Sequence, residues 1–198
     1  MSTRTSDPAS EETRNLAWHS VTEHSPCLIF IGMPGAGKST LASALASRLG
    51  WAFLDTDHLM EAWYGLPLEA LRQALGRKQF MLAEEKTLLG LEVYRCVVAT
   101  GGSAVYSPHA MEALQRNGVI IYLQADFPTI SQRVGRNPER GLVMRSGQSL
   151  HDIYQERCIL YERYADLVVS TVSASIQDCI QNLEASIYEL MPSEKKEQ

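Results

Sequence analysis

The sequence predicts an α/β fold in which a mostly parallel β-sheet is covered by helices on both faces. Apolar, strand-like segments alternate regularly with helical ones, and this order requires parallel strands joined by crossover helices. Residues 32–39, GMPGAGKS, match the phosphate-binding pattern G-x-x-x-x-G-K-[ST] at every defined position. The pattern lies between an apolar strand at 27–31 and a helix at 39–49. This context predicts a P-loop that binds a nucleoside triphosphate, as in P-loop NTPases.

The residue types of this loop suit each part of a triphosphate. Its glycines allow backbone angles and close approaches that a side chain would block, so that N–H groups can turn toward phosphate oxygens. Lys38 would reach the β- and γ-phosphates, and the Ser39 hydroxyl would hold Mg²⁺. The predicted nucleotide-binding residues of the loop are Gly32, Gly35, Ala36, Gly37, Lys38, Ser39 and Thr40.

Length and composition indicate one ordinary globular domain. The chain has 198 residues, of which 45% are hydrophobic. We expect residues 1–25 to form a flexible extension, 26–190 the domain, and 191–198 a polar tail. A net charge of −5 argues against a nucleic-acid partner, and no apolar stretch reaches the length of a membrane span. We therefore expect a cytoplasmic protein with no membrane partner, while its state as monomer or dimer stays open.

The second predicted strand, at 51–55, follows Gly50, which ends the P-loop helix. It leads into Asp55-Thr56-Asp57, so two carboxylates lie at the carboxyl end of a parallel strand, where such sheets bind ligands. Asp55 and Asp57 are therefore candidates for a metal ligand and a base. Asp57 could also cap the helix that follows it, and the two roles can hold together.

The remaining elements continue the alternation. Ser107, followed by Pro108, is a favourable helix start between the third and fourth strands. The other predicted segments are helices at 67–75, 78–94, 150–164 and 175–190, and strands at 95–100, 119–123 and 167–169.

Residues 135–148 interrupt this pattern with glycines, a proline and arginines, among them Arg140. Such a segment can be a solvated surface loop. Because the chain has a P-loop, we favour a mobile lid that brings arginine to the transferring phosphate.

In this order, the segments resemble the shikimate kinase family, small P-loop kinases of the nucleoside monophosphate kinase type. The resemblance covers about residues 26–190. It rests on the P-loop, residues 54–57, Phe80 with Glu84, Gly101-Gly102, Arg140, and Arg157 with Leu160-Tyr161. It implies ATP as the nucleotide, together with Mg²⁺.

The resemblance also implies roles for individual residues. Asp55 would help to hold Mg²⁺, and Asp57 would bind the acceptor hydroxyls and take the proton. Arg140 would act at the phosphates, Arg133 would lie against adenine, and Arg157 would pair with the substrate carboxylate. These roles suit the side chains, since a carboxylate accepts a proton and a guanidinium can grip a carboxylate through two parallel bonds.

An alternative for Arg157 is a surface salt bridge with Glu156 or Asp152 on its own helix.

Three positions depart from the family pattern. Shikimate kinases carry Phe-Arg-x-x-Glu where this chain has residues 80–84, FMLAE, so Met81 replaces an arginine that would hold the substrate carboxylate. The loss of one charge-assisted hydrogen bond costs about 1.5 to 3 kcal/mol and leaves Glu84 uncompensated. Ser103 stands in place of a third glycine and would narrow the loop, and Gly141-Leu142-Val143 makes the lid hinge looser.

From these departures we expect a substrate with a carboxylate, a cation and a hydroxyl, and hypothesise a hydroxy-amino acid kinase with L-homoserine as the best candidate. Arg157 would bind its carboxylate, Glu84 its ammonium and Asp57 its hydroxyl. The predicted substrate-binding residues are Asp57, Met81, Glu84, Gly101, Gly102, Ser103 and Arg157. The predicted catalytic residues are Lys38, Asp57 and Arg140, and the metal ligands are Ser39 and Asp55.

Two other hypotheses stay open. The chain could be a shikimate kinase that uses Arg72 or Arg77 in place of the missing arginine, or a nucleotide-binding regulator that has lost catalysis. Met81 could also face the core, since an apolar side chain at helical spacing is often buried.

Overall fold

The computed structural model describes residues 26–136, 142–143, 145, 147–172 and 175–190. Its centre is a five-stranded sheet with the strand order β2-β3-β1-β4-β5, in which every neighbouring pair is parallel. The strands are β1 (Cys27–Ile31), β2 (Ala52–Asp55), β3 (Cys96–Ala99), β4 (Gly118–Gln124) and β5 (Leu167–Ser170). The predicted parallel α/β sheet is therefore confirmed.

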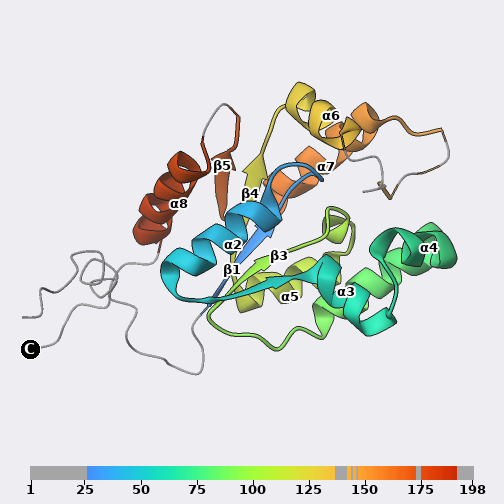
Figure 1. Ribbon diagram of the computed structural model, residues 1–198, viewed down its shortest axis with the longest axis horizontal. Coiled ribbons are helices and arrows are strands. Elements are labelled where there is room, and N and C mark those ends of the chain that lie inside the picture. Colours follow the sequence, from blue (N-terminus) through green and yellow to red (C-terminus); the bar gives the residue numbers. More distant parts are fainter. Residues whose placement is uncertain (1–25, 137–141, 144, 146, 173–174, 191–198) are drawn as a thin grey trace, which may run out of the picture.

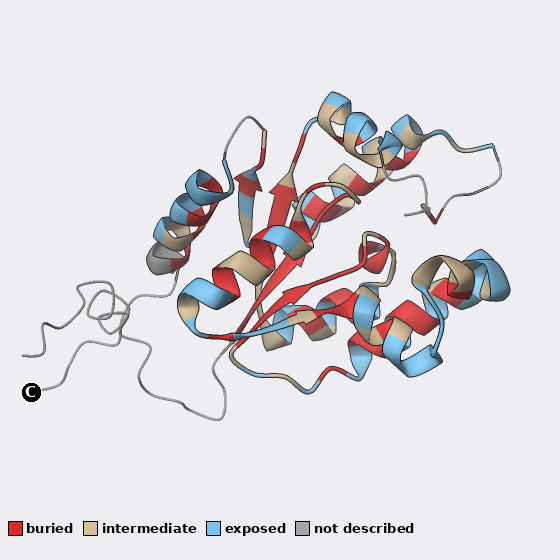
Figure 2. Ribbon diagram, in the orientation of Figure 1, coloured by how far each residue is buried: buried red, intermediate tan, exposed pale blue. Residues whose placement is uncertain are grey.

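Helices cover both faces of this sheet (Figure 1). Helices α2 (Lys38–Leu49) and α8 (Ile176–Leu190) contact each other over one face, while α5 (Pro108–Asn117) and α7 (Leu150–Tyr164) pack against β4. Every residue of β1 and β3 is buried as a result (Figure 2). This two-sided burial explains why these strands are continuous apolar runs instead of alternating patterns.

The region from 67 to 94 differs from its prediction. The two expected helices form one element, α4 (Leu68–Leu89), with a break at Gly76, where φ is 65° and ψ is 171°. A residue with a side chain rarely adopts these angles, so glycine permits the break while the helix axis changes direction. Helix α4 also ends at Leu89, five residues earlier than the sequence indicates, because Gly90 caps it.

Two further helices were not delimited from the sequence. Helix α3 (Thr56–Tyr64) begins directly after β2, and its N-cap is Asp55, which accepts a hydrogen bond of 3.0 Å from the Asp57 backbone N–H. The prediction that Asp57 could cap this helix is therefore wrong. Helix α6 (Phe127–Gly135) is capped by Asp126 and has a proline in its first turn. The sequence Asp-Phe-Pro contained this start signal.

Helices α3 and α4 stand beyond the carboxyl ends of β2 and β3, to the right in Figure 1. A short 3-10 helix, η1 (Ala104–Tyr106), links β3 to α5 and contacts both α4 and α7. These elements surround the carboxyl edge of the sheet, where the P-loop follows β1. Within the described ranges, no helix combines the length and the apolar character needed to cross a bilayer.

Candidate active site

A cavity of about 680 Å³ lies at the carboxyl edge of the sheet. Its wall combines the P-loop, the start of α3, both arms of α4, the loop after β3, and α7. Most of the predicted site residues line it: Gly35, Ala36, Gly37, Lys38, Ser39, Thr40, Asp55, Asp57, Glu84, Gly101, Gly102, Ser103, Arg133 and Arg157. Tertiary structure thus brings together residues from distant parts of the chain.

The P-loop has the geometry of a phosphate cradle. Its glycines have positive φ angles of 145° at Gly32, 85° at Gly35 and 98° at Gly37. Gly37 is the N-cap of α2, so the partial positive charge of that helix faces the loop. Gly32 itself does not line the cavity; a side chain there would lie 2.7 Å from the Leu123 carbonyl oxygen.

Lys38 and Ser39 follow the loop in the first turn of α2. The Lys38 ammonium donates to the carbonyl oxygens of Gly32 at 2.8 Å and Met33 at 3.1 Å, which holds it across the cradle. The Ser39 hydroxyl donates to the Asp55 carboxylate at 2.6 Å, so two oxygen ligands converge at the end of β2. Mg²⁺ is commonly held by one or two protein oxygens together with phosphates and waters, and this pair fits that requirement.

Asp57 and Glu84 line the cavity next to Gly101. A Cβ atom on Gly101 would overlap Glu84 Oε1 and would lie only 2.8 Å from Asp57 Oδ1. The glycine therefore lets two carboxylates approach the same stretch of backbone. The Gly101 N–H itself donates to the Thr56 hydroxyl at 3.1 Å, which ties the loop to α3.

The Glu84 carboxylate is not left without compensation, contrary to our expectation. Its Oε2 accepts a hydrogen bond of 2.5 Å from the Ser103 hydroxyl, and the two residues are only 3% and 6% exposed. The pKa of Glu84 is raised to about 7, chiefly by burial and also by the neighbouring Asp57, while Ser103, Arg157 and Lys38 act in the opposite direction. Ser103 thus stabilises a carboxylate that is otherwise costly to bury.

Arg157 is a buried cavity residue and not part of a surface salt bridge. It is 1% exposed, and its guanidinium donates to the Tyr106 hydroxyl at 3.3 Å and to the Val143 carbonyl at 3.1 Å. The guanidinium also stacks on the Tyr106 ring, 5.1 Å from its centroid. The two alternative partners bond elsewhere, Asp152 to Ser149 and Glu156 to Arg145 and Gln148.

Two tyrosines support the site; Tyr106 was missed by sequence reasoning, and Tyr161 was named only as part of the family motif, without a role. Tyr106 orients Arg157, and Tyr161 donates a hydrogen bond of 2.6 Å to the Gly102 carbonyl. Tyr161 lies one turn after Arg157 on α7, and this spacing is a signal that could have suggested a shared inner face. A Cβ atom on Gly102 would lie 2.8 Å from Pro34 Cδ and 3.1 Å from Arg157 Nη1, so glycine is favoured there too.

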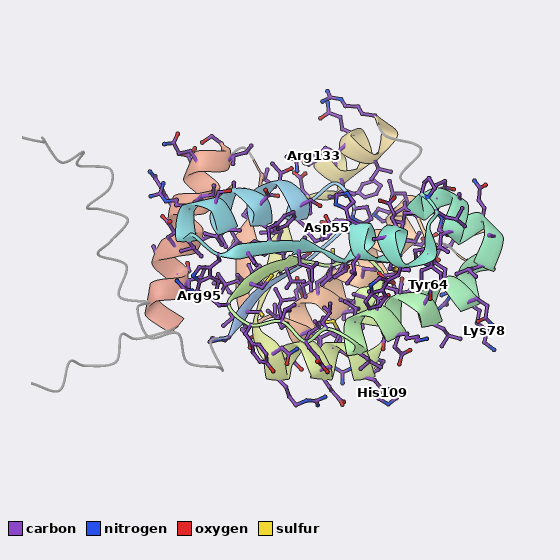
Figure 3. All side chains as sticks on the ribbon, turned by 60° about the horizontal axis from the view of Figure 1, so that its bottom comes forward. Asp55, Tyr64, Lys78, Arg95, His109 and Arg133 are labelled. Atoms are coloured by element: carbon purple, nitrogen blue, oxygen red, sulfur yellow. The ribbon has the colours of Figure 1, made fainter. Side chains whose placement is uncertain are left out.

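The nucleotide end of the cavity includes Arg133 on α6, which donates to the Gly35 carbonyl at 3.0 Å. Figure 3 labels Arg133 beside the P-loop and Asp55 where β2 passes into α3. In the predicted lid, Leu142 and Val143 line the cavity. Arg140 lies outside the described residues.

Met81 is not among the residues that line this cavity, contrary to its assignment as a substrate contact. It packs, partly buried, against the cluster formed by Met60, Leu71, Phe80, Ala83 and Val143, and lines a separate pocket of about 230 Å³. The core alternative describes this position better. The two arginines considered as replacements also separate, since Arg72 lines the large cavity and Arg77 the smaller pocket.

Comparison with known proteins assigns this site to a family. The model of the family "Shikimate kinase" matches residues 34–188. The shikimate kinase of Thiobacillus denitrificans is 34% identical over 157 residues, which cover 75% of this chain and 83% of that protein. The shikimate kinase of Bordetella avium is 30% identical over 197 residues, with coverages of 96% and 93%.

A solved structure gives the same result. The shikimate kinase of Acinetobacter baumannii in complex with shikimate superposes with a TM-score of 0.79 and 29% sequence identity, over 86% of this chain and 97% of that one. The prediction of a small-molecule kinase that acts on a hydroxyl group is confirmed by these relatives, and the regulator hypothesis loses its support.

The hypothesis of an L-homoserine kinase is wrong. The relatives are named shikimate kinases, and shikimate is the ligand in the solved structure. The hypothesis rested on an uncompensated Glu84 and on Met81 as a substrate contact, and neither holds in the structure.

Proposed function

Because this chain belongs to the shikimate kinase family, whose members are phosphotransferases that act on a hydroxyl group, we propose that it transfers the γ-phosphate of ATP to shikimate, forming shikimate 3-phosphate. One observation carries the proposal: a single cavity has a phosphate cradle at one end and, at the other, a carboxylate and a buried guanidinium. The cradle suits a triphosphate, while the carboxylate and the guanidinium suit a substrate with a hydroxyl and a carboxylate.

The phosphate end aligns the nucleotide. The N–H groups at the start of α2 and the Lys38 ammonium would bind phosphate oxygens, with Arg133 beside the loop against the base. Ser39 and Asp55 would hold Mg²⁺, which when bound neutralises charge on the phosphates. Phosphoryl transfer depends chiefly on such alignment and charge neutralisation. Arg140 would add a further cation from the lid.

The acceptor end orients shikimate. Arg157 would bind the carboxylate, because Tyr106 and Val143 already hold its guanidinium in place at the cavity wall. Asp57 would accept the proton of the attacking hydroxyl, whose oxygen forms the new bond to the γ-phosphorus as the bond to the β,γ-bridging oxygen breaks. ADP, the phosphate ester and a protonated Asp57 result. Gly101 and Gly102 lack the Cβ atoms that would collide with Asp57 and crowd Arg157, so both side chains can keep their places.

A coupled assay of ADP release with Mg-ATP tests the proposal. We expect turnover that requires shikimate and shows saturation, with L-homoserine as a control acceptor that supports none. Asp57→Asn should lower kcat by about 10² to 10⁴-fold while the KM for ATP stays within a factor of about three, because the variant loses a base and keeps the nucleotide site. A wild-type protein that releases no ADP with shikimate would refute the proposed function.

A further inference from the structure

We propose that Arg72 binds the carboxylate of the substrate together with Arg157, and so supplies the second cation that the chain lacks at Met81. This inference rests on the proposed function. It assigns substrate recognition to a residue on the first arm of α4, eight residues before Phe80 in the sequence.

The break in α4 separates the arginines of its two arms. Arg72 precedes Gly76 and lines the large cavity, together with Pro67, Leu68 and Glu69. Arg77 follows Gly76 and lines the smaller pocket, as do Lys78 and Met81. In Figure 3 the labelled Lys78 lies at the outer edge of the molecule, away from Asp55. Only the first arm therefore brings a guanidinium to the acceptor site.

Arg72 lies at the same end of the cavity as Arg157. Its neighbour Leu71 belongs to one buried cluster with Phe80 and Val143, and the Val143 carbonyl accepts a hydrogen bond from Arg157 Nη2. Phe80 and Val143 also line the cavity, so they give this end of it an apolar floor. A ring that carries a carboxylate can rest on such a floor while its charged group meets both cations.

The Arg72 side chain is held in place and is largely shielded from solvent. It is 16% exposed, and its Nη2 forms an ion pair with Glu69 one turn earlier in the helix. A guanidinium has five N–H donors in a fixed plane, so one contact with Glu69 orients it and leaves other donors able to meet a ligand. The ordering cost on binding is correspondingly small.

The charges of the acceptor site favour a second cation. Asp57 and Glu84 both face this part of the cavity, and each would repel an incoming carboxylate. Among the described residues, Arg157 and Lys38 act on the Glu84 carboxylate, and Lys38 is held over the P-loop by two carbonyl oxygens. A second guanidinium raises the local positive charge where the substrate carboxylate binds, without a cation at position 81.

Steady-state kinetics with Arg72→Gln and the matched control Arg77→Gln test the assignment. We expect Arg72→Gln to raise the KM for shikimate by about tenfold to a hundredfold, with kcat and the KM for ATP within a factor of about three. Arg77→Gln, on the same helix but on the smaller pocket, should leave all three values unchanged. Arg72→Lys keeps a charge beside Glu69 and should give an intermediate KM for shikimate. This variant can replace Arg72→Gln if Arg72→Gln folds poorly.

A charge-specific readout separates binding from a structural role. The test uses a second substrate, the primary amide of shikimate, whose carboxamide has no charge. The measured quantity is kcat/KM for shikimate divided by kcat/KM for the amide. In Arg72→Gln this ratio should fall by about tenfold or more, and in Arg77→Gln it should equal the wild-type ratio. An unchanged ratio in both Arg72 variants would refute the role of Arg72 alone. Wild-type protein without shikimate turnover would refute the proposed function and this inference with it.

Discussion

At the scale of single residues, Ser103 stabilises the buried carboxylate of the acceptor site. Its hydroxyl donates to Glu84, while Met81, where the family pattern has an arginine, lies on the smaller pocket. A buried carboxylate without any partner costs several kcal/mol, so this hydrogen bond makes the burial of Glu84 tolerable. The serine therefore does more than narrow the loop in which a glycine is expected.

The raised pKa of Glu84 predicts a pH-dependent stability. The unfolded chain binds this proton only below about 4.5, whereas the folded protein binds it up to about 7. The folded state thus holds more protons in between, and its stability falls as the pH rises from about 4.5 to 7. Glu84→Gln removes this loss, so its free energy of unfolding relative to wild type should increase from pH 5 to pH 8 by up to about 3 kcal/mol.

Urea denaturation of the free protein at both pH values measures this difference. Glu112→Gln, an exposed position on α5, is the control and should show no such change. Parallel pH curves for wild type and Glu84→Gln would contradict the prediction.

At the scale of secondary-structure elements, the break in α4 determines which side chains reach the site. The first arm presents Arg72 to the large cavity, and the second arm presents Phe80 and Glu84 to the cavity and Met81 to the smaller pocket. A straight helix could not hold both arms in these directions, since the axis changes at Gly76. One glycine thus governs the arrangement of the acceptor wall.

Gly76→Ala should therefore destabilise the protein. Its φ of 65° and ψ of 171° are strained for a residue with a side chain, although a Cβ atom there would meet no other group. We expect a loss of about 1 to 3 kcal/mol in the free energy of unfolding, measured by urea denaturation. Gly135→Ala at the end of α6 is the matched control, because it also has open space but a φ outside the positive range. That control should be neutral or slightly stabilising; equal effects of both variants would argue against strain at Gly76.

At the scale of the whole molecule, the cavity joins elements that are distant in the sequence, so a ligand that fills it links them. The P-loop, α3, α4, the loop after β3 and α7 all contribute to its wall. Such a ligand binds the folded protein alone and stabilises it by mass action.

A non-hydrolysable ATP analogue with Mg²⁺ should therefore raise the melting temperature. At a concentration 100 times its Kd the gain is about 2.7 kcal/mol, which corresponds to a rise of about 5 to 10 °C for a chain of this size. Chelation of Mg²⁺ with EDTA should remove much of the rise, because Ser39 and Asp55, the proposed metal ligands, would then no longer contribute to nucleotide binding through the ion. In Lys38→Ala most of the rise in melting temperature should be lost. A rise equal to that of wild type would mean that the nucleotide binds away from the P-loop.

The local elements of the fold and the nucleotide end of the site were predictable from the sequence. Apolar runs such as 27–31, the phosphate-binding pattern and the strand-to-helix order are encoded in neighbouring residues, so they can be recognised before folding is known. Asp57 and Arg157 were also assigned, although only the resemblance to a family linked them to one site.

Side-chain partners that come from different elements required the tertiary structure. Glu84 meets Ser103 across 19 positions, and Arg157 meets Val143 across 14. The break at Gly76 sends Arg72 and Arg77 to different cavities although they are five positions apart. The sequence by itself therefore determined the parallel P-loop fold and the class of chemistry, because these depend on contiguous residues. Only the tertiary structure decided which charges face the acceptor, because packing between elements sets the direction of each side chain.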